Sequence, residues 1–168
     1  FIREVSRTCT VSLGHSSADY DTAVEAFACG ASHATHLFNG MDPIHHRKPG
    51  IIGAAFQAGA SVELICDGLH IHPEVIRMAH PLYGERLNPI SDSLRCAGMP
   101  DGDYELGGQP ITVKSGKATL TGTDTLAGSS ISVLDALRNV VSFGFSLPDA
   151  VYAASTAPAR AVRLDDVG

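Results

Sequence analysis

Four short apolar segments of the chain each end in a residue that can bind a metal ion or transfer a proton. These residues are His15, His36, the group from Asp67 to His70, and Asp92. Any one of them alone fits a structural role, because a neutral imidazole with one hydrogen bond is common in proteins. Four consecutive segments with the same kind of ending indicate a shared site. All eight histidines also fall in the first half of the chain, at positions 15, 33, 36, 45, 46, 70, 72 and 80.

Metal-assisted hydrolysis is the chemistry that this order of residues predicts. Neighbouring strands of a parallel sheet lie about 4.8 Å apart, so imidazoles at the ends of two such strands can converge on one divalent ion. His15 and His36 would provide two ligands, and a catalytic ion needs about three, with one position open for water. Asp92 would then take a proton from that water, so that hydroxide attacks a carbonyl carbon. We expect the third ligand upstream of Phe1.

The segments that carry these residues alternate with helical patterns, which predicts an α/β fold with a parallel sheet. In such folds functional residues gather at the carboxyl ends of the strands. Strands are expected at 8–13, 32–36, 62–66 and 87–90, and helices at about 16–29, 51–58, 73–82 and 131–143, with a last helix from about 146. The expected apolar faces are Tyr20, Val24, Phe27 and Ala28 in the first helix, and Ile131, Leu134, Leu137 and Val141 in the fourth.

Four strand–helix units correspond to half of a (β/α)8 barrel, which needs eight units in roughly 250 residues. We predict such a half barrel over residues 1–168, with a β-hairpin insertion at about 103–121. An open doubly wound sheet is the alternative, but it usually has a glycine-rich phosphate loop after its first strand, and none occurs here. Since the first residues include no initiator methionine and no signal-peptide pattern, we expect a longer protein. The isolated half barrel is expected to self-associate through its unpaired sheet edges.

Composition excludes several classes of function. The net charge of −6 and the lack of a basic run argue against binding to nucleic acid or to anionic membranes. No apolar stretch approaches the roughly 20 residues that span a bilayer. The four cysteines form no C-x-x-C pair, so we expect buried, reduced thiols in a cytoplasmic protein rather than a sulfur-bound metal. These cysteines are Cys9, Cys29, Cys66 and Cys96.

Seven short motifs in a fixed order carry a more specific signal. They read GHS at 14–16, ATHLFNGM at 34–41, HRKPG at 46–50, DGLH at 67–70, ISD at 90–92, LAGS at 126–129 and PAR at 158–160. From about Gly14 to Leu164 the chain thereby resembles the N-acetylglucosamine-6-phosphate deacetylases of the amidohydrolase superfamily. The resemblance implies the second half of a TIM-type barrel. It also implies removal of an acetyl group from the amino sugar phosphate.

The resemblance further implies roles for individual residues. His15 and His36 would bind a divalent metal ion, with zinc as the first choice and iron, manganese or cobalt as alternatives. Asp92 would be the proton donor and acceptor. Substrate contacts would come from Asn39, Gly40, Arg47, Asp67, Gly68, Leu69, His70, Leu126, Ala127 and Gly128. Arg47 would reach the phosphate across a homodimer interface, since a guanidinium can hold two phosphate oxygens. His70 would bind a sugar hydroxyl or add positive charge near the phosphate.

Two small departures and one large gap separate the chain from that family. Asn39-Gly40 replaces the usual Asn-Ala, and Ser91-Asp92 replaces Thr-Asp. A glutamate ligand and a histidine that polarises the acetyl carbonyl are expected upstream of Phe1. Activity of this chain alone is therefore left open.

The same residues also allow other interpretations. A different amidohydrolase, acting on a cyclic amide or a base, would use the same His, His and Asp. An inactive fragment would keep the fold alone. Arg47, beside three other basic or imidazole side chains, would equally suit a solvated loop. His33, His72 and His80 are interpreted as structural or surface residues, and the LAGS motif as a helix start with a capping serine.

Overall fold

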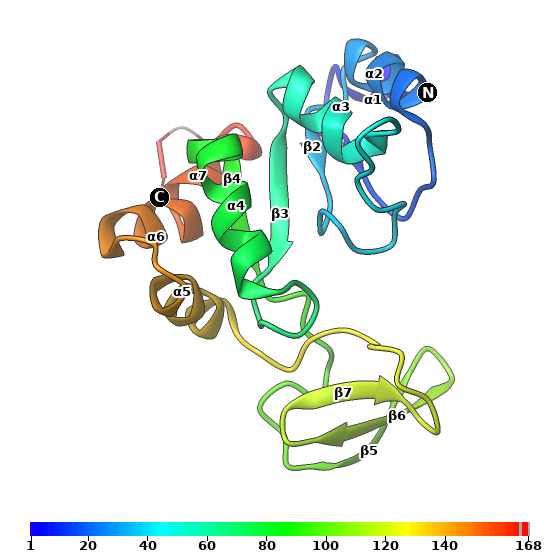
Figure 1. Ribbon diagram of the computed structural model, residues 1–168, viewed down its shortest axis with the longest axis vertical. Helices are drawn as coiled ribbons and strands as arrows, with labels where there is room; N and C mark the ends of the chain where they lie inside the picture. Colours follow the sequence, from blue (N-terminus) through cyan, green and yellow to red (C-terminus); the bar gives the residue numbers. More distant parts are fainter. Residues whose placement is uncertain (165, 168) are drawn as a thin grey trace.

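A four-stranded parallel sheet forms the centre of the molecule (Figure 1). The structure is a computed structural model and describes residues 1–164, 166 and 167. The strands pair in chain order and are β1 (Ser12–Leu13), β2 (His33–Ala34), β3 (Ser61–Ile65) and β4 (Leu87–Ile90). This confirms an α/β fold with a parallel sheet.

The first two strands are shorter than predicted, because local turns take up the residues on either side. The amides of Thr8 and Cys9 both donate to the carbonyl of Val5, which continues the turn that ends the first helix. At the other end, the backbone of His36 turns into the left-handed region, with φ of +29°, so β2 cannot continue. The prediction of 8–13 and 32–36 was therefore too long at both sites.

Helices precede, follow or separate these strands. They are α1 (Ile2–Val5), α2 (Tyr20–Ala28), α3 (Gly50–Ala58), α4 (Pro73–Tyr83), α5 (Val133–Ser142), α6 (Leu147–Ala154) and α7 (Thr156–Ala161), with a 3-10 turn at Gly84–Arg86. α4 contacts β3 and β4, and α5, α6 and α7 contact β4. The helices at about 16–29, 51–58, 73–82, 131–143 and after 146 were predicted, although the first of them, α2, begins only at Tyr20. α1 and α7 were not predicted.

The helix starts follow from side chains that cap free backbone amides. Asp19 accepts a hydrogen bond from the Thr22 amide at 2.9 Å and begins α2. In α5 the capping serine is Ser132, which forms a reciprocal capping box with Asp135. The prediction that a serine of the LAGS motif caps this helix was wrong, because Ser129 instead bonds to Ser91, the residue after β4.

A second, antiparallel sheet replaces the predicted hairpin insertion. It contains β5 (Gly102–Leu106), β6 (Gln109–Lys114) and β7 (Lys117–Leu120), joined by turns at the predicted glycines, Gly107-Gly108 and Ser115-Gly116. Two turns give three strands. This sheet has its own small core, and Figure 1 shows it beyond the tip of the β3 arrow, away from the helices. The core residues are Cys96, Ile111, Val113 and Ala118.

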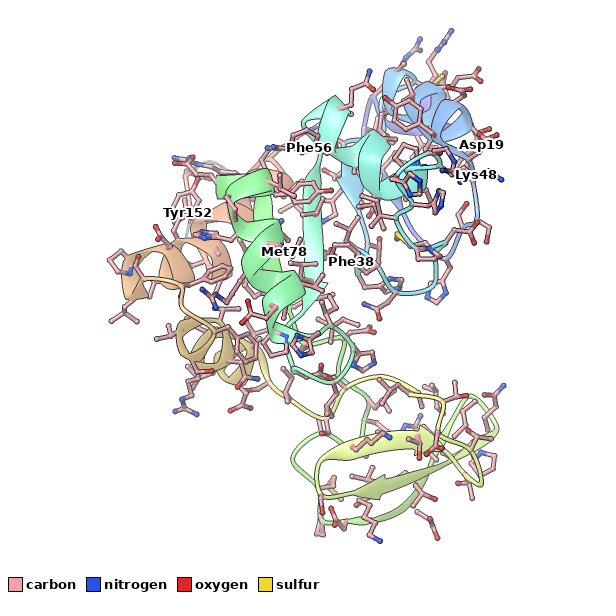
Figure 2. All side chains as sticks on the ribbon, in the orientation of Figure 1. Asp19, Phe38, Lys48, Phe56, Met78 and Tyr152 are labelled. Atoms are coloured by element: carbon pink, nitrogen blue, oxygen red, sulfur yellow. The ribbon has the colours of Figure 1, made fainter. Side chains whose placement is uncertain are left out.

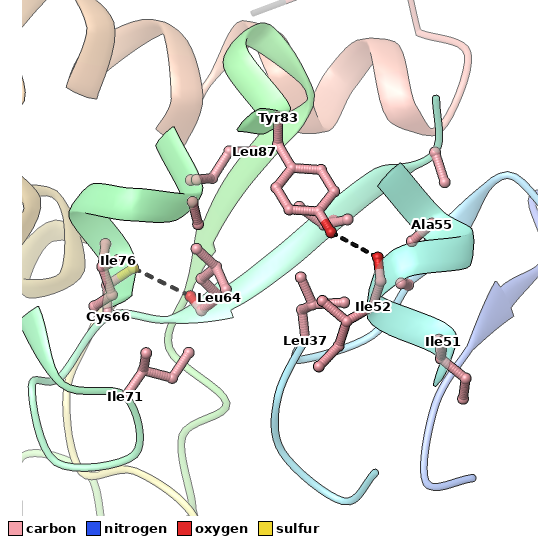
Figure 3. Close-up of a cluster of buried hydrophobic side chains, with 14 of the residues drawn as sticks. Leu37, Ile51, Ile52, Ala55, Leu64, Cys66, Ile71, Ile76, Tyr83 and Leu87 are labelled. Carbon is pink, nitrogen blue, oxygen red and sulfur yellow. Dashed lines mark hydrogen bonds between the residues drawn. The ribbon is translucent and has the colours of Figure 1, made fainter. Parts of the chain in front are cut away.

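The main core joins the sheet to α3 and α4 (Figure 3). Leu37, Leu64 and Leu87 are fully buried there, and each contributes about 1.5–3 kcal/mol by leaving water. The buried Tyr83 hydroxyl donates to the Ile52 carbonyl at 2.9 Å and so ties α4 to α3. Burial raises the pKa of Tyr83 to about 12, which keeps the hydroxyl protonated as a donor.

Some predictions of burial were wrong. Ala28 and Leu134 are exposed, and α2 buries Ala23 with Phe27 while α5 buries Ala136 with Val140. Each helix is therefore rotated about its axis, so that the face it buries differs from the predicted apolar face. Of the four cysteines, all free, Cys66 and Cys96 are buried as predicted, Cys9 is exposed and Cys29 is half-buried. In the part of the chain that is described, no helix is long and apolar enough to cross a bilayer.

Candidate active site at the carboxyl ends of the strands

Four candidate residues occupy equivalent places in the sheet. Each lies two residues beyond the last residue of its strand: His15 after β1, His36 after β2, Asp67 after β3 and Asp92 after β4. The strands are parallel, so their carboxyl ends share one edge of the sheet. The register aligns Leu13 with Ala34 and Ile65 with Ile90. The fold thus brings together residues that are far apart in the sequence.

Three of these residues have a backbone conformation that side chains rarely adopt. The φ angles are +45° at His15, +29° at His36 and +46° at Asp92. Left-handed backbone at a residue other than glycine costs about 1–3 kcal/mol and persists only where the surroundings enforce it. Such strain is concentrated at functional sites, and here it turns three side chains at the ends of three strands.

His15 and His36 approach each other closely. Their ring centroids are 4.5 Å apart and the rings meet edge to face. His36 is buried, and its Nδ1 has no hydrogen-bond partner among the described residues. A buried imidazole nitrogen without a partner is unfavourable unless something else binds it. In the described ranges, 1–164 and 166–167, no third His, Cys, Asp or Glu completes a group that could hold a metal.

Glu63, in the middle of β3, contacts both the ring of His33 and the backbone of His36. One carboxylate oxygen lies 3.0 Å from Nε2 of His33, and the other accepts the His36 amide at 3.3 Å. Burial opposes ionisation of this carboxyl, but the hydrogen bond and charge of His33 and the His36 amide outweigh it, so the pKa of Glu63 is lowered. Glu63 therefore fixes the backbone that carries the strained His36.

The LAGS motif holds the loop of Asp92. The amide of Ser129 donates to the Asp92 carbonyl at 3.0 Å, and the Ser129 hydroxyl donates to the Ser91 carbonyl. Gly128 is required at this contact, since a Cβ there would lie 2.8 Å from Leu94 and its φ is +144°. Asp92 itself is exposed. The chain after β7 thus returns to the main sheet and sets the position of Asp92.

A cleft of about 790 Å³ unites most of the predicted site residues. It is large enough for a small ligand, since ligand sites are typically 300–1,000 Å³. The predicted residues that line it are His15, His36, Asn39, Gly40, His70, Asp92, Leu126, Ala127 and Gly128. The second sheet and the segment after it contribute Leu106 and Asp124, which no sequence pattern indicated. Sequence spacing carried no signal for them, because only the return of the second sheet brings them to the cleft.

Four predicted substrate-binding residues lie outside this cleft. Asp67 holds His70 through a 2.6 Å contact between its carboxylate and Nδ1, while Gly68 and Leu69 form the intervening turn. Arg47 lines a separate cleft of about 660 Å³, together with Asp19 and Lys48, which Figure 2 labels near each other. Within one chain, Arg47 therefore does not face His15 or Asp92.

The remaining histidines agree with the structural interpretation. His33 is buried against Glu63, His72 caps α4 by accepting the Glu74 amide at 3.2 Å, and His80 stacks on Phe145 with centroids 4.0 Å apart. Two supporting residues, Glu63 and Ser129, were missed as such. A charge inside the apolar run Val62–Ile65 was the available signal for Glu63.

The chain is similar in sequence and structure to known proteins. The chain is 43% identical over 131 residues to N-acetylglucosamine-6-phosphate deacetylase from Vibrio furnissii, covering 77% of the chain and 33% of that protein. It is 40% identical over 159 residues to N-acetylgalactosamine-6-phosphate deacetylase from Escherichia coli O157:H7, covering 94% of the chain and 42% of that protein. The chain thus spans less than half the length of these relatives.

A solved structure and a family model extend the comparison over almost every residue. A variant N-acetyl-D-glucosamine-6-phosphate deacetylase from Mycobacterium smegmatis, in complex with N-acetyl-D-glucosamine-6-phosphate, superimposes with a TM-score of 0.95 at 37% identity. The match covers 99% of this chain and 46% of that one. The family model described as "Amidohydrolase family" matches residues 2–168. The chain belongs to the amidohydrolase family.

Proposed function

We propose that the protein containing this chain is a metal-dependent deacetylase of phosphorylated N-acetyl amino sugars, with N-acetylglucosamine 6-phosphate as its first substrate. One observation supports this above the others. Two imidazoles that nearly touch and a carboxylate, all on strained backbone, line a single cleft at the carboxyl ends of parallel strands. We take the sheet to be the second half of a (β/α)8 barrel with the β5–β7 sheet as an insertion.

His15 and His36 suit a divalent ion chemically. The unpartnered Nδ1 of His36 and the 4.5 Å ring separation leave donor atoms for a shared ligand, and imidazole is a preferred ligand of zinc. When bound, such an ion polarises a carbonyl and makes water more acidic. The residues of this chain favour zinc, with iron, manganese or cobalt as alternatives. A further ligand is expected outside this chain.

Asp92 is the group that moves the proton. Its carboxylate takes a proton from the water that attacks the acetyl carbonyl carbon, and it later gives that proton to the nitrogen of the departing amine. The attack forms the second C–O bond of acetate, and the C–N bond breaks when the carbonyl double bond re-forms. The products are acetate and the free amino sugar phosphate, so no other reactant is needed.

The sugar would be held by polar groups on the walls of the same cleft. His70 and Asn39 offer side-chain hydrogen-bonding groups, and Leu126 to Gly128 lie beside the Asp92 loop. The relatives include enzymes named for both the gluco and the galacto sugar, which makes N-acetylgalactosamine 6-phosphate the second candidate substrate. The two sugars differ only in the orientation of one hydroxyl group.

Arg47 is proposed to bind the phosphate of a substrate that lies in the cleft of a second copy. Its position in a separate cleft supports contact across a homodimer rather than within one chain. A guanidinium on an exposed loop can reach a neighbouring subunit and grip two phosphate oxygens. A cytoplasmic location agrees with a phosphorylated metabolite as substrate, and it stays a prediction.

Substrate comparison at full natural length tests the proposal. Acetate release would be measured for N-acetylglucosamine 6-phosphate, its galacto epimer and unphosphorylated N-acetylglucosamine, and ring opening would be measured for the cyclic amide hydantoin. Removal of bound metal with a chelator should abolish activity, and added zinc should restore it. A preference for hydantoin would favour the rival amidohydrolase. Absence of both metal and acetate release would favour an inactive protein.

A further inference from the structure

Asp67 is fully occupied by its own turn. One oxygen of its carboxylate accepts the backbone amides of Leu69 and His70, at 2.8 Å and 2.9 Å. The other lies 2.6 Å from Nδ1 of the His70 ring. The side chain of Asp67 is only 4% exposed, and Asp67 does not line the cleft. Its position therefore gives a ligand in the cleft no access to the carboxylate.

His70 lines the cleft, and Asp67 holds one of its two ring nitrogens. An ionised carboxylate can only accept hydrogen bonds, so Nδ1 of His70 must carry the hydrogen in this contact. In the neutral ring, Nε2 is then an acceptor with a free lone pair. No partner for Nε2 is found among the described residues, and His70 lines the cleft that contains His15 and Asp92.

The turn that carries both residues is anchored from helix α5. Nδ2 of Asn139 donates to the carbonyl of Cys66 at 2.8 Å, directly before Asp67. α5 follows the second sheet in the chain, and its N-terminus is fixed by the Ser132–Asp135 capping box. The Asp67–His70 pair therefore sits on a rigid support, as an oriented binding group requires.

We propose that Asp67 is a positioning residue and not a substrate ligand: it holds His70 with the hydrogen on Nδ1, so that Nε2 accepts a hydrogen bond from a sugar hydroxyl. This rests on the proposed function for the identity of the sugar. The predicted substrate contact at Asp67 is thereby replaced by an indirect role through His70. Gly68 and Leu69 serve the same turn.

The Asp67→Asn variant tests this, because it should move the hydrogen of the His70 ring from Nδ1 to Nε2. The amide oxygen of Asn still accepts the hydrogen bonds from the two backbone amides, so its NH2 group faces Nδ1 of His70. Nδ1 must then accept, and the hydrogen moves to Nε2. In the full natural-length protein, 15N NMR of the His70 side chain should show the hydrogen on Nδ1 before the substitution and on Nε2 after it. A hydrogen on Nε2 in the unmodified protein overturns the proposal, even if the variant fails to fold.

A double-mutant cycle with His70→Ala separates positioning from direct contact. We expect Asp67→Asn to raise KM for N-acetylglucosamine 6-phosphate about 10-fold to 100-fold, by analogy with residues that orient metal-ligating histidines. In the His70→Ala background the same substitution should change KM less than about 2-fold, because the route through the ring is gone. An equal rise in KM in both backgrounds would show that Asp67 contacts the substrate directly or has a purely structural role, and would overturn the proposal.

The control is Asn139→Asp, a change of similar size that removes the Cys66 anchor without touching the ring of His70. It should leave the hydrogen of His70 on Nδ1. A shift of that hydrogen to Nε2 in this variant would assign the orientation to the turn and not to Asp67. If the unmodified protein releases no acetate from any phosphorylated amino sugar, the proposed function fails, whereas the NMR result still decides the role of Asp67.

Discussion

The imidazoles of His15 and His36 meet edge to face with centroids 4.5 Å apart, although a complete helix, α2, separates them in the chain. Parallel pairing of β1 with β2 produces this relationship, since Leu13 lies opposite Ala34 and each histidine follows two residues later. The pair is the most specific structural feature of the candidate site, and metal binding is the first property to test.

Substitution of either histidine should remove the metal. His15→Ala or His36→Ala would be made in the protein at full natural length. Either change should weaken metal binding by more than about 100-fold, the upper end of the range for residues that only orient a metal ligand. Metal content after dialysis, measured by mass spectrometry, checks this. His72→Asn is the matched control, because Asn can also cap α4 and His72 is exposed outside the cleft. Retention of a full equivalent of metal by both alanine variants would contradict the assignment.

Asp92→Asn should reduce kcat by about 10²-fold to 10⁴-fold, the usual contribution of a positioned acid or base, while metal content is unchanged. The amide keeps the shape of the side chain but cannot take up a proton. Asp103→Asn on β5 is a suitable control, because its oxygen can still accept the Thr112 hydroxyl. Near-normal turnover of Asp92→Asn would remove Asp92 from the mechanism.

Arg47 in trans can be tested by mixing two inactive variants. Homodimers of Arg47→Ala and of Asp92→Asn should each have low activity at moderate substrate concentration. After dissociation and reassociation, a mixed dimer has one site with both residues intact, so about a quarter of the normal activity should return for random pairing in a two-fold dimer. If mixed dimers are verified by native mass spectrometry and activity does not recover, Arg47 does not complete the site of the partner subunit, and the proposal for Arg47 is wrong.

Gly128→Ala should impair the Asp92 loop. The new Cβ would lie 2.8 Å from Leu94, and a φ of +144° is strained for alanine. We expect a loss of stability of about 1–3 kcal/mol together with lower kcat. Gly98→Ala provides the comparison, because φ is +76° there and the Cβ would meet nothing within 4 Å. Equal effects of the two substitutions on kcat would show that the loop tolerates the contact.

Acid should weaken the fold through Asp67. Burial raises the pKa of this carboxyl, but the hydrogen bonds from the His70 ring and from the amides of His70 and Leu69 outweigh it, so the pKa lies below the ordinary 3.8. Its stabilising effect is then complete above that ordinary value and is lost as the pH falls through the lowered one. Urea unfolding between about pH 5 and pH 2 should show a steeper loss for the unmodified protein than for Asp67→Asn. Parallel curves would contradict this.

Local chemistry made much of the fold predictable from the sequence. Alternation of apolar strands and amphipathic helices indicated the parallel sheet, and Gly107-Gly108 and Ser115-Gly116 marked two turns of the second sheet. His15, His36 and Asp92 were identifiable because each lies shortly after an apolar strand, and strand ends in a parallel sheet share one edge.

Contacts between distant segments decided the rest. The bridge from Glu63 to His36, the return of Ser129 to the Asp92 carbonyl, and the placement of Leu106 in the cleft each join parts of the chain that no local pattern relates. Arg47 lies in a different cleft for the same reason. Residue type determines what a side chain can donate, accept or ligate, whereas the register and packing of whole elements determine which partner it meets.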